Sequence, residues 1–305
     1  MATIEHDDQA PLTEHRLARE HIEGGIALSV AAGWNQNEAD WRLFFDHGYG
    51  VGLSDGDGQL CATTMIIPLG PRFAWISVVL VAERVRRRGL ATQLTEWATR
   101  ELAGKRIVPF LDATPAGREV YLRLGFNDCW WLERLIAPAP HVSVAMESNV
   151  VTGSAVIPQQ RSHDIRSITD ATWPQVLAYD ALIFGGDRSA ILGSLRARLP
   201  DASLYVEEAG QVVGFILARD GRLATQLGPL CADRADIAIA LLSHALSRVR
   251  YPVCIDLPER HRSIRDWLTA RGFSVGRPFS RMALGRTKTF DDLSRLIASA
   301  GPEFG

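Results

Sequence analysis

The chain has 305 residues, of which 47% are hydrophobic, and its mean hydropathy is close to zero. A chain of this length can bury substantial cores, and the length favours two domains. The formal net charge of −2 argues against a protein built around a nucleic-acid backbone or an anionic membrane surface.

The spacing of the cysteines and the composition of the N-terminal residues indicate in which cellular compartment the protein is expected. Cys61, Cys129, Cys231 and Cys254 lie far apart without a C-x-x-C pair, so we expect free thiols in a reducing compartment and no metal site. The first residues are polar and acidic, unlike a signal peptide, and no apolar run reaches about 18 residues. The sequence predicts a soluble, cytoplasmic protein.

The first elements of the chain are predicted from capping and turn residues. Residues 14–30 contain a helix, alone or after a first strand, and Asn37 is suited to cap a short helix that follows. Residues 49–53 and 59–67 flank two Asp-Gly pairs and predict a β-hairpin.

A buried strand and a helix flank a basic turn near the middle of the N-terminal half of the chain. Residues 76–81 are apolar and rich in β-branched side chains, and an amphipathic helix begins near Leu90. The turn reads RRRG over residues 86–89. The first N–H groups of a helix lack partners and carry partial positive charge, so they attract phosphate, and Gly89 lets it approach closely. The alternative is a solvated basic turn ahead of a surface helix.

The half ends with a strand, a helix and another strand. Residues 107–111 are a short apolar strand, Thr114 is suited to cap the next helix, and Gly125 is suited to end it. Residues 126–136 are predicted to be a closing strand.

Two motifs in this half resemble those of the GCN5-related N-acetyltransferase (GNAT) family. R-x-x-G-x-A at residues 86–91, after a V-x-V strand, resembles the family's pyrophosphate-binding motif, and Y-x-x-x-G-F at residues 121–126 resembles its second signature. The family usually has proline where Glu83 stands, a departure that leaves the turn intact. Neither a P-loop nor a Rossmann motif occurs. The resemblance covers about residues 12–137.

The resemblance implies an acetyl-CoA-dependent N-acetyltransferase without a metal, acting on an amine of a small molecule or a protein. Tyr121 is the candidate general acid, because the matching family tyrosine lies near the coenzyme sulfur and a phenol suits donation to a thiolate. Packing in the core is the alternative for this side chain. The resemblance assigns acetyl-CoA binding to Val79, Leu80, Val81, Arg86, Arg87, Arg88, Gly89, Leu90, Ala91 and Thr92.

The acceptor site is less clearly marked. In this family the segment between the first two strands walls the acceptor pocket, so Trp34, Asn35 and Asp40 are candidate substrate contacts. A tryptophan such as Trp34 is more often part of a core than a platform for a ligand, and packing in the core is the alternative for this side chain. Asp112 is a further candidate at the substrate site, and fixing the following helix is its alternative role.

The sequence marks no general base. No carboxylate occurs at residues 73–81, which leaves Asp112, Glu119, His47 or a chain of water molecules.

The same order of elements returns after residue 163. The W-L-T-A-R-G-F stretch at residues 267–273 lies where the tyrosine motif lay, which indicates an internal duplication. Asp233 and Asp236 stand where the basic turn would fall and would repel a pyrophosphate, and Trp267 lacks a useful proton for a thiolate. The expected elements are strand 164–168, helices 171–182 and 188–199, hairpin 203–218, strand 222–231, helix 235–249 and strand 253–257.

The predicted fold class is α/β (α+β), with two tandem acyl-CoA N-acyltransferase (GNAT) folds, each a mixed, mostly antiparallel sheet flanked by helices. The predicted domains are an acetyl-CoA-binding domain at 1–137, a linker at 138–163 and a divergent GNAT-like domain at 164–305.

The whole chain resembles bacterial tandem acetyltransferases of the YitH type, through the stretches AGWNQ, LDATPAGR and FGGDR. On that resemblance Asp180, Asp187 and Arg188 reach the acceptor cleft, unless they only pair and cap helices.

Other functions remain open at this point. One is a CoA-responsive binding or regulatory protein without turnover, and another is a second acyl-CoA site in the second half, which Asp233 and Asp236 disfavour. We expect acetyl-CoA and a small amine as partners, no nucleic acid or membrane, and a monomer or homodimer.

Overall fold

A computed structural model of the protein describes residues 11–140 and 163–305, so most of the expected linker lies outside the described residues. The first half contains β1 (Thr13–Arg16), α1 (Ile22–Ala31), α2 (Glu38–His47), β2 (Tyr49–Ser54), β3 (Leu60–Pro68), β4 (Phe73–Val81), α3 (Leu90–Ala103), β5 (Val108–Ala113), α4 (Pro115–Arg123) and β6 (Phe126–Ala137). The second half contains β7 (Ile165–Ser167), α5 (Trp173–Phe184), α6 (Ser189–Arg198), β8 (Leu204–Glu208), β9 (Gln211–Arg219), β10 (Thr225–Ala232), α7 (Ala235–Leu246), β11 (Val253–Pro258), α8 (Arg262–Thr269), β12 (Ser274–Leu284) and β13 (Leu296–Ala298).

Local signals place the helix ends as expected. The Asn37 side chain accepts a hydrogen bond from the Asp40 amide at 3.2 Å, which caps α2. Thr114 accepts one from the Gly117 amide at 3.2 Å and caps α4. Gly125, just after α4, has φ of +86°, a conformation that glycine adopts without steric cost.

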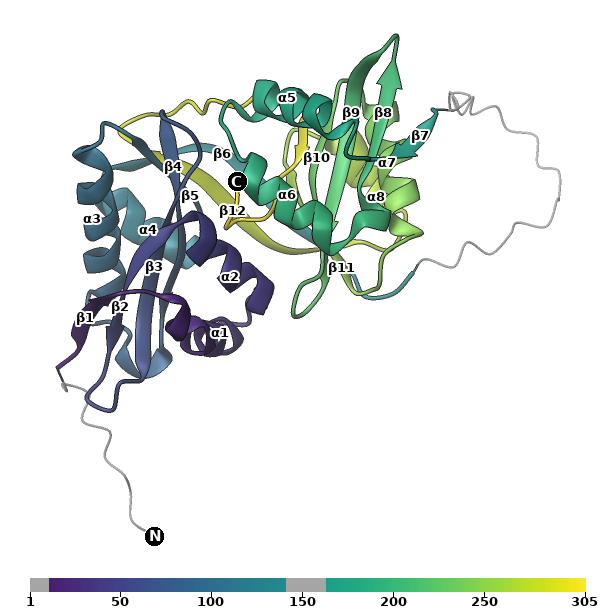
Figure 1. Ribbon diagram of the computed structural model, residues 1–305. Coiled ribbons are helices and arrows are strands. Elements are labelled where there is room, and N and C mark those ends of the chain that lie inside the picture. The colour runs from purple at the N-terminus through teal and green to yellow at the C-terminus, as the bar shows by residue number, and fades with distance from the viewer. Residues whose placement is uncertain (1–10, 141–162) are drawn as a thin grey trace.

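The strands form one continuous sheet in the order β1-β2-β3-β4-β5-β12-β6-β11-β10-β9-β8-β7, with β13 paired to β10 (Figure 1). The predicted mixed, mostly antiparallel class is confirmed. Within each half one pair is parallel, β4 with β5 and β10 with β11. The two halves therefore repeat one topology, as the duplication predicts.

The halves exchange their last long strands. β12, from the second half, pairs with β5, whereas β6, from the first half, pairs with β11, and the two exchanged strands pair with each other. The expectation that residues 126–136 close a sheet is therefore wrong, because β6 has a neighbour on both sides. The domain boundaries stay a prediction, and neither half completes its sheet alone.

Apolar packing also joins the halves. One cluster includes Trp41, Phe44 and Phe73 from the first half and Phe184 and Phe304 from the second. The Phe44 and Phe304 rings lie 5.1 Å apart, and those of Phe73 and Phe184 lie 5.6 Å apart. No helix in the described ranges is long and apolar enough to cross a membrane.

Candidate active site

The basic turn between β4 and α3 has the backbone of an anion site. Arg87 and Gly89 have φ of +63° and +76°, and Gly89 is the N-cap of α3. Left-handed residues that alternate with right-handed or extended ones turn successive N–H groups toward one point. A Cβ built on Gly89 would meet no protein atom within 4 Å, so the space above this backbone is open. The turn thus fits a phosphate group.

Arginine side chains surround that space. Arg84, Arg86, Arg87, Arg88 and Glu83 line a hollow of about 750 Å³. Asp55 binds Arg84 at 2.7 Å, so this guanidinium is partly neutralised. The arginine side chains at positions 86–88 are exposed. Because these three positive charges outnumber the single negative charge of Glu83, the hollow is positively charged.

β4 is distorted just before the turn. Its pairing with β3 shifts register between Thr63 and Met65, and Val78 has φ of +45°, a strained conformation for a β-branched residue. The Thr63 hydroxyl donates to the Val78 carbonyl at 2.8 Å and supports the bulge. The parallel pairing of β4 with β5 is recorded only over residues 73–75, so the two strands diverge beyond Trp75.

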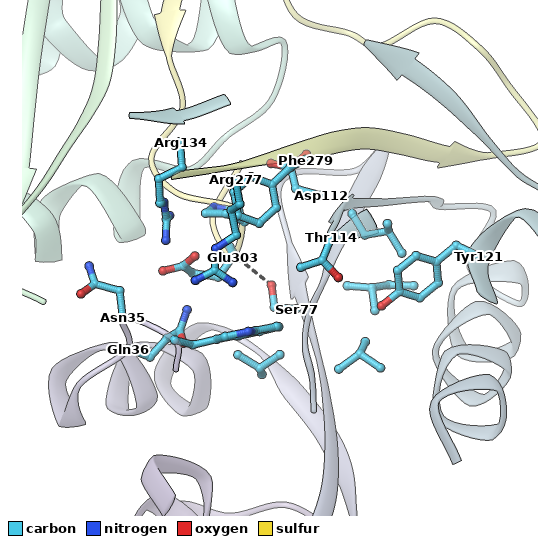
Figure 2. A pocket seen from close by; sticks show the side chains of 16 residues that line it. Asn35, Gln36, Ser77, Asp112, Thr114, Tyr121, Arg134, Arg277, Phe279 and Glu303 are labelled. Atoms are coloured by element: carbon cyan, nitrogen blue, oxygen red, sulfur yellow. Dashed lines mark hydrogen bonds between the residues drawn. The ribbon is translucent and has the colours of Figure 1, made fainter. Parts of the chain in front are cut away.

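A narrow pocket, with a volume of about 40 Å³, opens where these strands diverge. Figure 2 shows Tyr121 at one end and Asn35 and Gln36 at the other, with Arg277 and Glu303 between them. Its walls are Trp34, Asn35, Gln36, Ile76, Ser77, Val78, Val79, Leu111, Asp112, Thr114, Tyr121, Arg134, Arg277, Phe279, Pro302 and Glu303. The candidate residues Trp34, Asn35, Asp112, Tyr121 and Val79 therefore share one pocket.

Tyr121 lies on α4 with 8% of its surface exposed. Burial raises the pKa of its phenol well above the usual value, which keeps the hydroxyl protonated. Its ring packs 5.9 Å from that of Phe126, and its hydroxyl points toward the pocket in Figure 2. Packing in the core and facing the pocket are thus both true of this side chain.

Asn35 holds the two halves together. Its side chain accepts hydrogen bonds from the amides of Leu223 and Ala224, at 2.8 and 3.0 Å, and donates to the Ala224 carbonyl at 3.0 Å. Because its amide is occupied in this way, Asn35 shapes the pocket wall.

Asp112 is engaged in a buried ion pair across the exchanged strands. Arg281 of β12 stands opposite it in the sheet, and two guanidinium nitrogens donate to its two oxygens at 2.9 Å each. Burial raises the pKa of Asp112, and the Arg281 charge opposes that shift. The Trp75 and Trp130 rings lie 4.5 and 4.3 Å from the guanidinium.

Other candidates lie outside the pocket. Asp180 and Arg188 form a buried pair at 2.8 Å, and Asp187 accepts from the Ser189 amide at the start of α6. Their alternative role, pairing and capping helices, is the one observed, and none of the three lines the pocket between β4 and β5. That they reach the acceptor cleft stays a prediction. Of the candidate bases, His47 ends α2 and Glu119 pairs with Arg118 at 3.7 Å.

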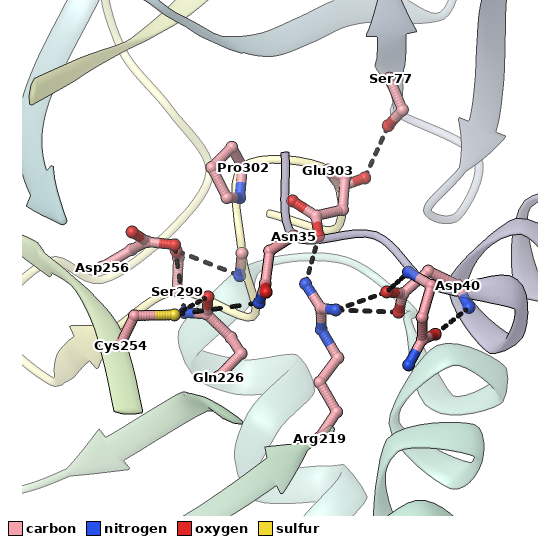
Figure 3. Close-up of polar contacts among 12 residues, drawn as sticks. Asn35, Asp40, Ser77, Arg219, Gln226, Cys254, Asp256, Ser299, Pro302 and Glu303 are labelled. Carbon is pink, nitrogen blue, oxygen red and sulfur yellow. Dashed lines mark hydrogen bonds and ion pairs between the residues drawn. The ribbon is translucent and has the colours of Figure 1, made fainter. Parts of the chain in front are cut away.

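Asp40 is also outside the pocket lining. It is fully buried and binds Arg219 at 2.8 Å (Figure 3). It also binds Arg198 at 2.6 Å, and both arginines belong to the second half. Asp40, a candidate substrate contact from the sequence, therefore forms ion pairs that join the two halves.

The second half has no equivalent opening in its described residues. β13 pairs with β10, and the Ser299 amide that follows donates to the Asp256 carbonyl of β11 at 3.0 Å, so this segment fills the gap between β10 and β11. At the start of α7, Asp233 accepts from the Tyr179 hydroxyl at 2.8 Å and Asp236 pairs with Arg234 at 3.2 Å.

Sequence reasoning missed the pocket residues that come from the end of the chain: Arg277, Phe279, Pro302 and Glu303. No motif surrounds them. The exchange of β12 brings Arg277 and Phe279 to the pocket, and hydrogen bonds of the segment after β13 to Trp75 and Ser77 bring Pro302 and Glu303 there. Ser77 and Gln36, next to residues that were singled out, were also missed.

Comparisons with known proteins agree with this arrangement. Residues 19–126 match a family model described as the acetyltransferase (GNAT) family, and residues 176–298 match one described as an acetyltransferase (GNAT) domain. A curated relative, the uncharacterised N-acetyltransferase YitH of Bacillus subtilis strain 168, is 23% identical over 259 residues, which cover 85% of this chain and 86% of the relative.

Solved structures share the fold over nearly the whole chain. A putative acetyltransferase from Pyrococcus horikoshii matches with a TM-score of 0.75 at 18% identity, covering 100% of this chain and 99% of its own. A tandem GNAT protein from the clavulanic acid biosynthesis pathway matches with a TM-score of 0.58 at 15% identity, covering 90% and 98%. The chain belongs to the GCN5-related N-acetyltransferase (GNAT) family, as a tandem member with one GNAT domain in each half.

Proposed function

We propose that the protein is an acetyl-CoA-dependent N-acetyltransferase whose reaction takes place in the pocket between β4 and β5. One observation carries the proposal: the basic turn, whose backbone suits an anion, and the Tyr121 hydroxyl flank the same pair of diverging strands. Family membership supports acyl transfer in general. The four free thiols of the described chain fit a reducing compartment such as the cytoplasm.

The chain offers two surfaces that fit acetyl-CoA. The N–H groups and arginines of residues 86–92 would hold its diphosphate, and the backbone of residues 79–81, beyond the last recorded pairing with β5, would hold its extended arm. When bound, the coenzyme supplies an activated acetyl thioester. Holding it beside an amine makes the transfer effectively unimolecular, which lowers the barrier by several kcal/mol, up to about 7–11.

Two groups of the chain would assist the transfer itself. Val78 and Val79, at the strained bulge, line the pocket, and a backbone N–H group there would suit the negative charge that develops on the thioester oxygen. As the amine nitrogen bonds to the acetyl carbon and the carbon–sulfur bond breaks, the Tyr121 hydroxyl suits the departing thiolate as a proton donor, because burial keeps it protonated. An ammonium acceptor would lose one proton before it attacks and one as the amide forms; one would restore Tyr121 and the other would pass through water to solvent.

A thiol-release assay with a panel of amines tests the proposal. We expect Tyr121→Phe to lower kcat by about 10² to 10⁴, the usual range for loss of a general acid, with little change in coenzyme binding. Tyr49→Phe is the matched control, since Tyr49 binds Lys105 at 2.9 Å and does not line the pocket.

Equal turnover in both variants would remove Tyr121 from the mechanism. Coenzyme binding without turnover on any amine would instead favour the alternative, a CoA-responsive binding or regulatory protein.

A further inference from the structure

The end of the described chain builds one wall of the pocket. The Ser77 hydroxyl donates to the Glu303 carbonyl at 2.6 Å (Figures 2 and 3). The Trp75 indole donates to the Pro302 carbonyl at 2.8 Å. Phe304 is fully buried in the cluster that joins the halves. Glu303 is thereby fixed beside β4, next to the bulge at Val78.

The Glu303 carboxylate has room for another hydrogen-bond donor. Its Oε1 accepts from Arg219, which also donates to both oxygens of Asp40 at 2.9 and 2.8 Å (Figure 3). Asp40 has a second cation in Arg198, whereas Arg219 is the cation bound to Glu303 among the described residues. No hydrogen bond to Glu303 Oε2 is recorded among the described residues. Asp112, the other carboxylate in the pocket wall, has both oxygens bound by Arg281. Glu303 is therefore the carboxylate in this wall that suits a cationic amine.

Gln36 presents a second acceptor to the same pocket. The residue is 4% exposed, and its side-chain oxygen is buried without a hydrogen-bond partner among the described residues. A buried acceptor that lacks a donor is costly, so a ligand that donates to it gains affinity. An amine carries the donors that Gln36 and Glu303 lack.

Arg277, in the same pocket wall, is a cationic donor that suits an anionic partner. It is half-buried, and burial together with the nearby Arg134 charge lowers the pKa of its guanidinium, although the charges of Asp256 and Glu303 oppose this shift. Arg134 is paired with Asp256 at 2.7 Å, whereas no ion pair of Arg277 is recorded in the described ranges. Its recorded contacts are the Gly33 carbonyl at 3.4 Å and the Phe279 ring at 5.8 Å. A guanidinium in this setting suits an anionic group with two acceptor oxygens.

We propose that the acceptor is a small aminocarboxylate, such as an amino acid, with its amine at Glu303 and Gln36 and its carboxylate at Arg277. The inference rests on the proposed acetyl transfer and adds the class of acceptor. It also gives the second half a role, because Glu303 and Arg277 both come from it.

Matched acceptor pairs test this class. Thiol release is measured at saturating acetyl-CoA with several amino acids and with their carboxamides, which keep the amine and lose the negative charge. We expect kcat/KM to favour the amino acid by at least about tenfold, the typical value of a charged hydrogen bond. We expect Arg277→Gln to reduce that preference by a similar factor, mainly through KM.

Three further variants keep the test independent of folding. Arg262→Gln, at the exposed start of α8, is the control for loss of a positive charge and should keep the preference. Gln36→Leu should raise KM for the amino acid and the carboxamide alike, because both contain the amine. Glu303→Gln should do the same, and thermal unfolding confirms that each variant is folded.

A binding measurement separates this inference from the proposed function. Calorimetric titration of amino acids into the protein with CoA present should show binding that Arg277→Gln weakens at least about tenfold. Such binding without turnover would support the acceptor class and overturn the proposed transfer. Equal use of amino acids and carboxamides, or equal effects of Arg277→Gln and Arg262→Gln, would overturn the acceptor class.

Discussion

The buried ion pair across the exchanged strands gives a strong prediction for Arg281→Met. The wild-type guanidinium is 1% exposed, binds both Asp112 oxygens at 2.9 Å and lies 3.3 Å from Asp291. Methionine fills much of the space between Trp75 and Trp130 but leaves both carboxylates without their cation. Removing one partner of a buried pair typically costs about 3–5 kcal/mol, so we expect the free energy of unfolding to fall by about that amount.

The loss should depend on pH. Burial already raises the folded-state pKa of Asp112, and removing Arg281 removes the charge that opposes this shift. A carboxyl with a raised folded pKa stabilises the fold while protonated, and that stability is lost as pH rises from about 3.9 through the folded value. The deficit of Arg281→Met should therefore be largest near neutral pH and shrink as the pH is lowered toward 4.

Urea unfolding of wild type and variant between pH 4 and 7 measures the deficit. Arg42→Met is the control, because its pair with Glu38 is exposed and should contribute under about 1 kcal/mol. The double variant Asp112→Asn with Arg281→Met should regain part of the loss. A deficit near 1 kcal/mol that does not change with pH would refute the reasoning.

Two other substitutions test how the pocket is shaped. Asn35→Ala removes hydrogen bonds to the Leu223 and Ala224 backbones, so we expect a loss of about 1–3 kcal/mol in urea unfolding; a loss below 0.5 kcal/mol would contradict the joining role. Thr63→Val removes the hydrogen bond to the Val78 carbonyl, so we expect about 1 kcal/mol lower stability and a lower kcat in the thiol-release assay; unchanged kcat would show that this bond does not hold the bulge.

The ends of several helices could be predicted from the sequence, because capping residues act on backbone groups only a few positions away. Asn37, Thr114 and Gly125 mark helix ends through capping and backbone conformations that depend on a few neighbouring residues. The basic turn could also be predicted locally, because it lies between a buried strand and a helix and contains Gly89, a residue that adopts the left-handed conformation without steric cost.

The exchange of β6 and β12 was not accessible in this way. Both are long strands, and their partners lie more than 100 residues away for β6 with β11 and for β12 with β5. Register over such separations depends on packing between elements, which no local pattern encodes. The place of Arg277 in the pocket wall was hidden for the same reason, and the place of Glu303 depends on a contact with Ser77, which lies more than 200 residues earlier in the chain.

Calorimetric titration of CoA into the full chain tests the central claim most directly, with wild type, Gly89→Asp and Gly210→Asp compared. Gly89 and Gly210 have φ of +76° and +78° with open space at Cβ, so both substitutions impose a similar backbone strain, but only Gly89 caps α3. We predict one CoA site per chain, weakened at least about tenfold by Gly89→Asp and unchanged by Gly210→Asp. Two sites per chain, or equal affinity in the two variants, would contradict a single coenzyme site at the turn after β4.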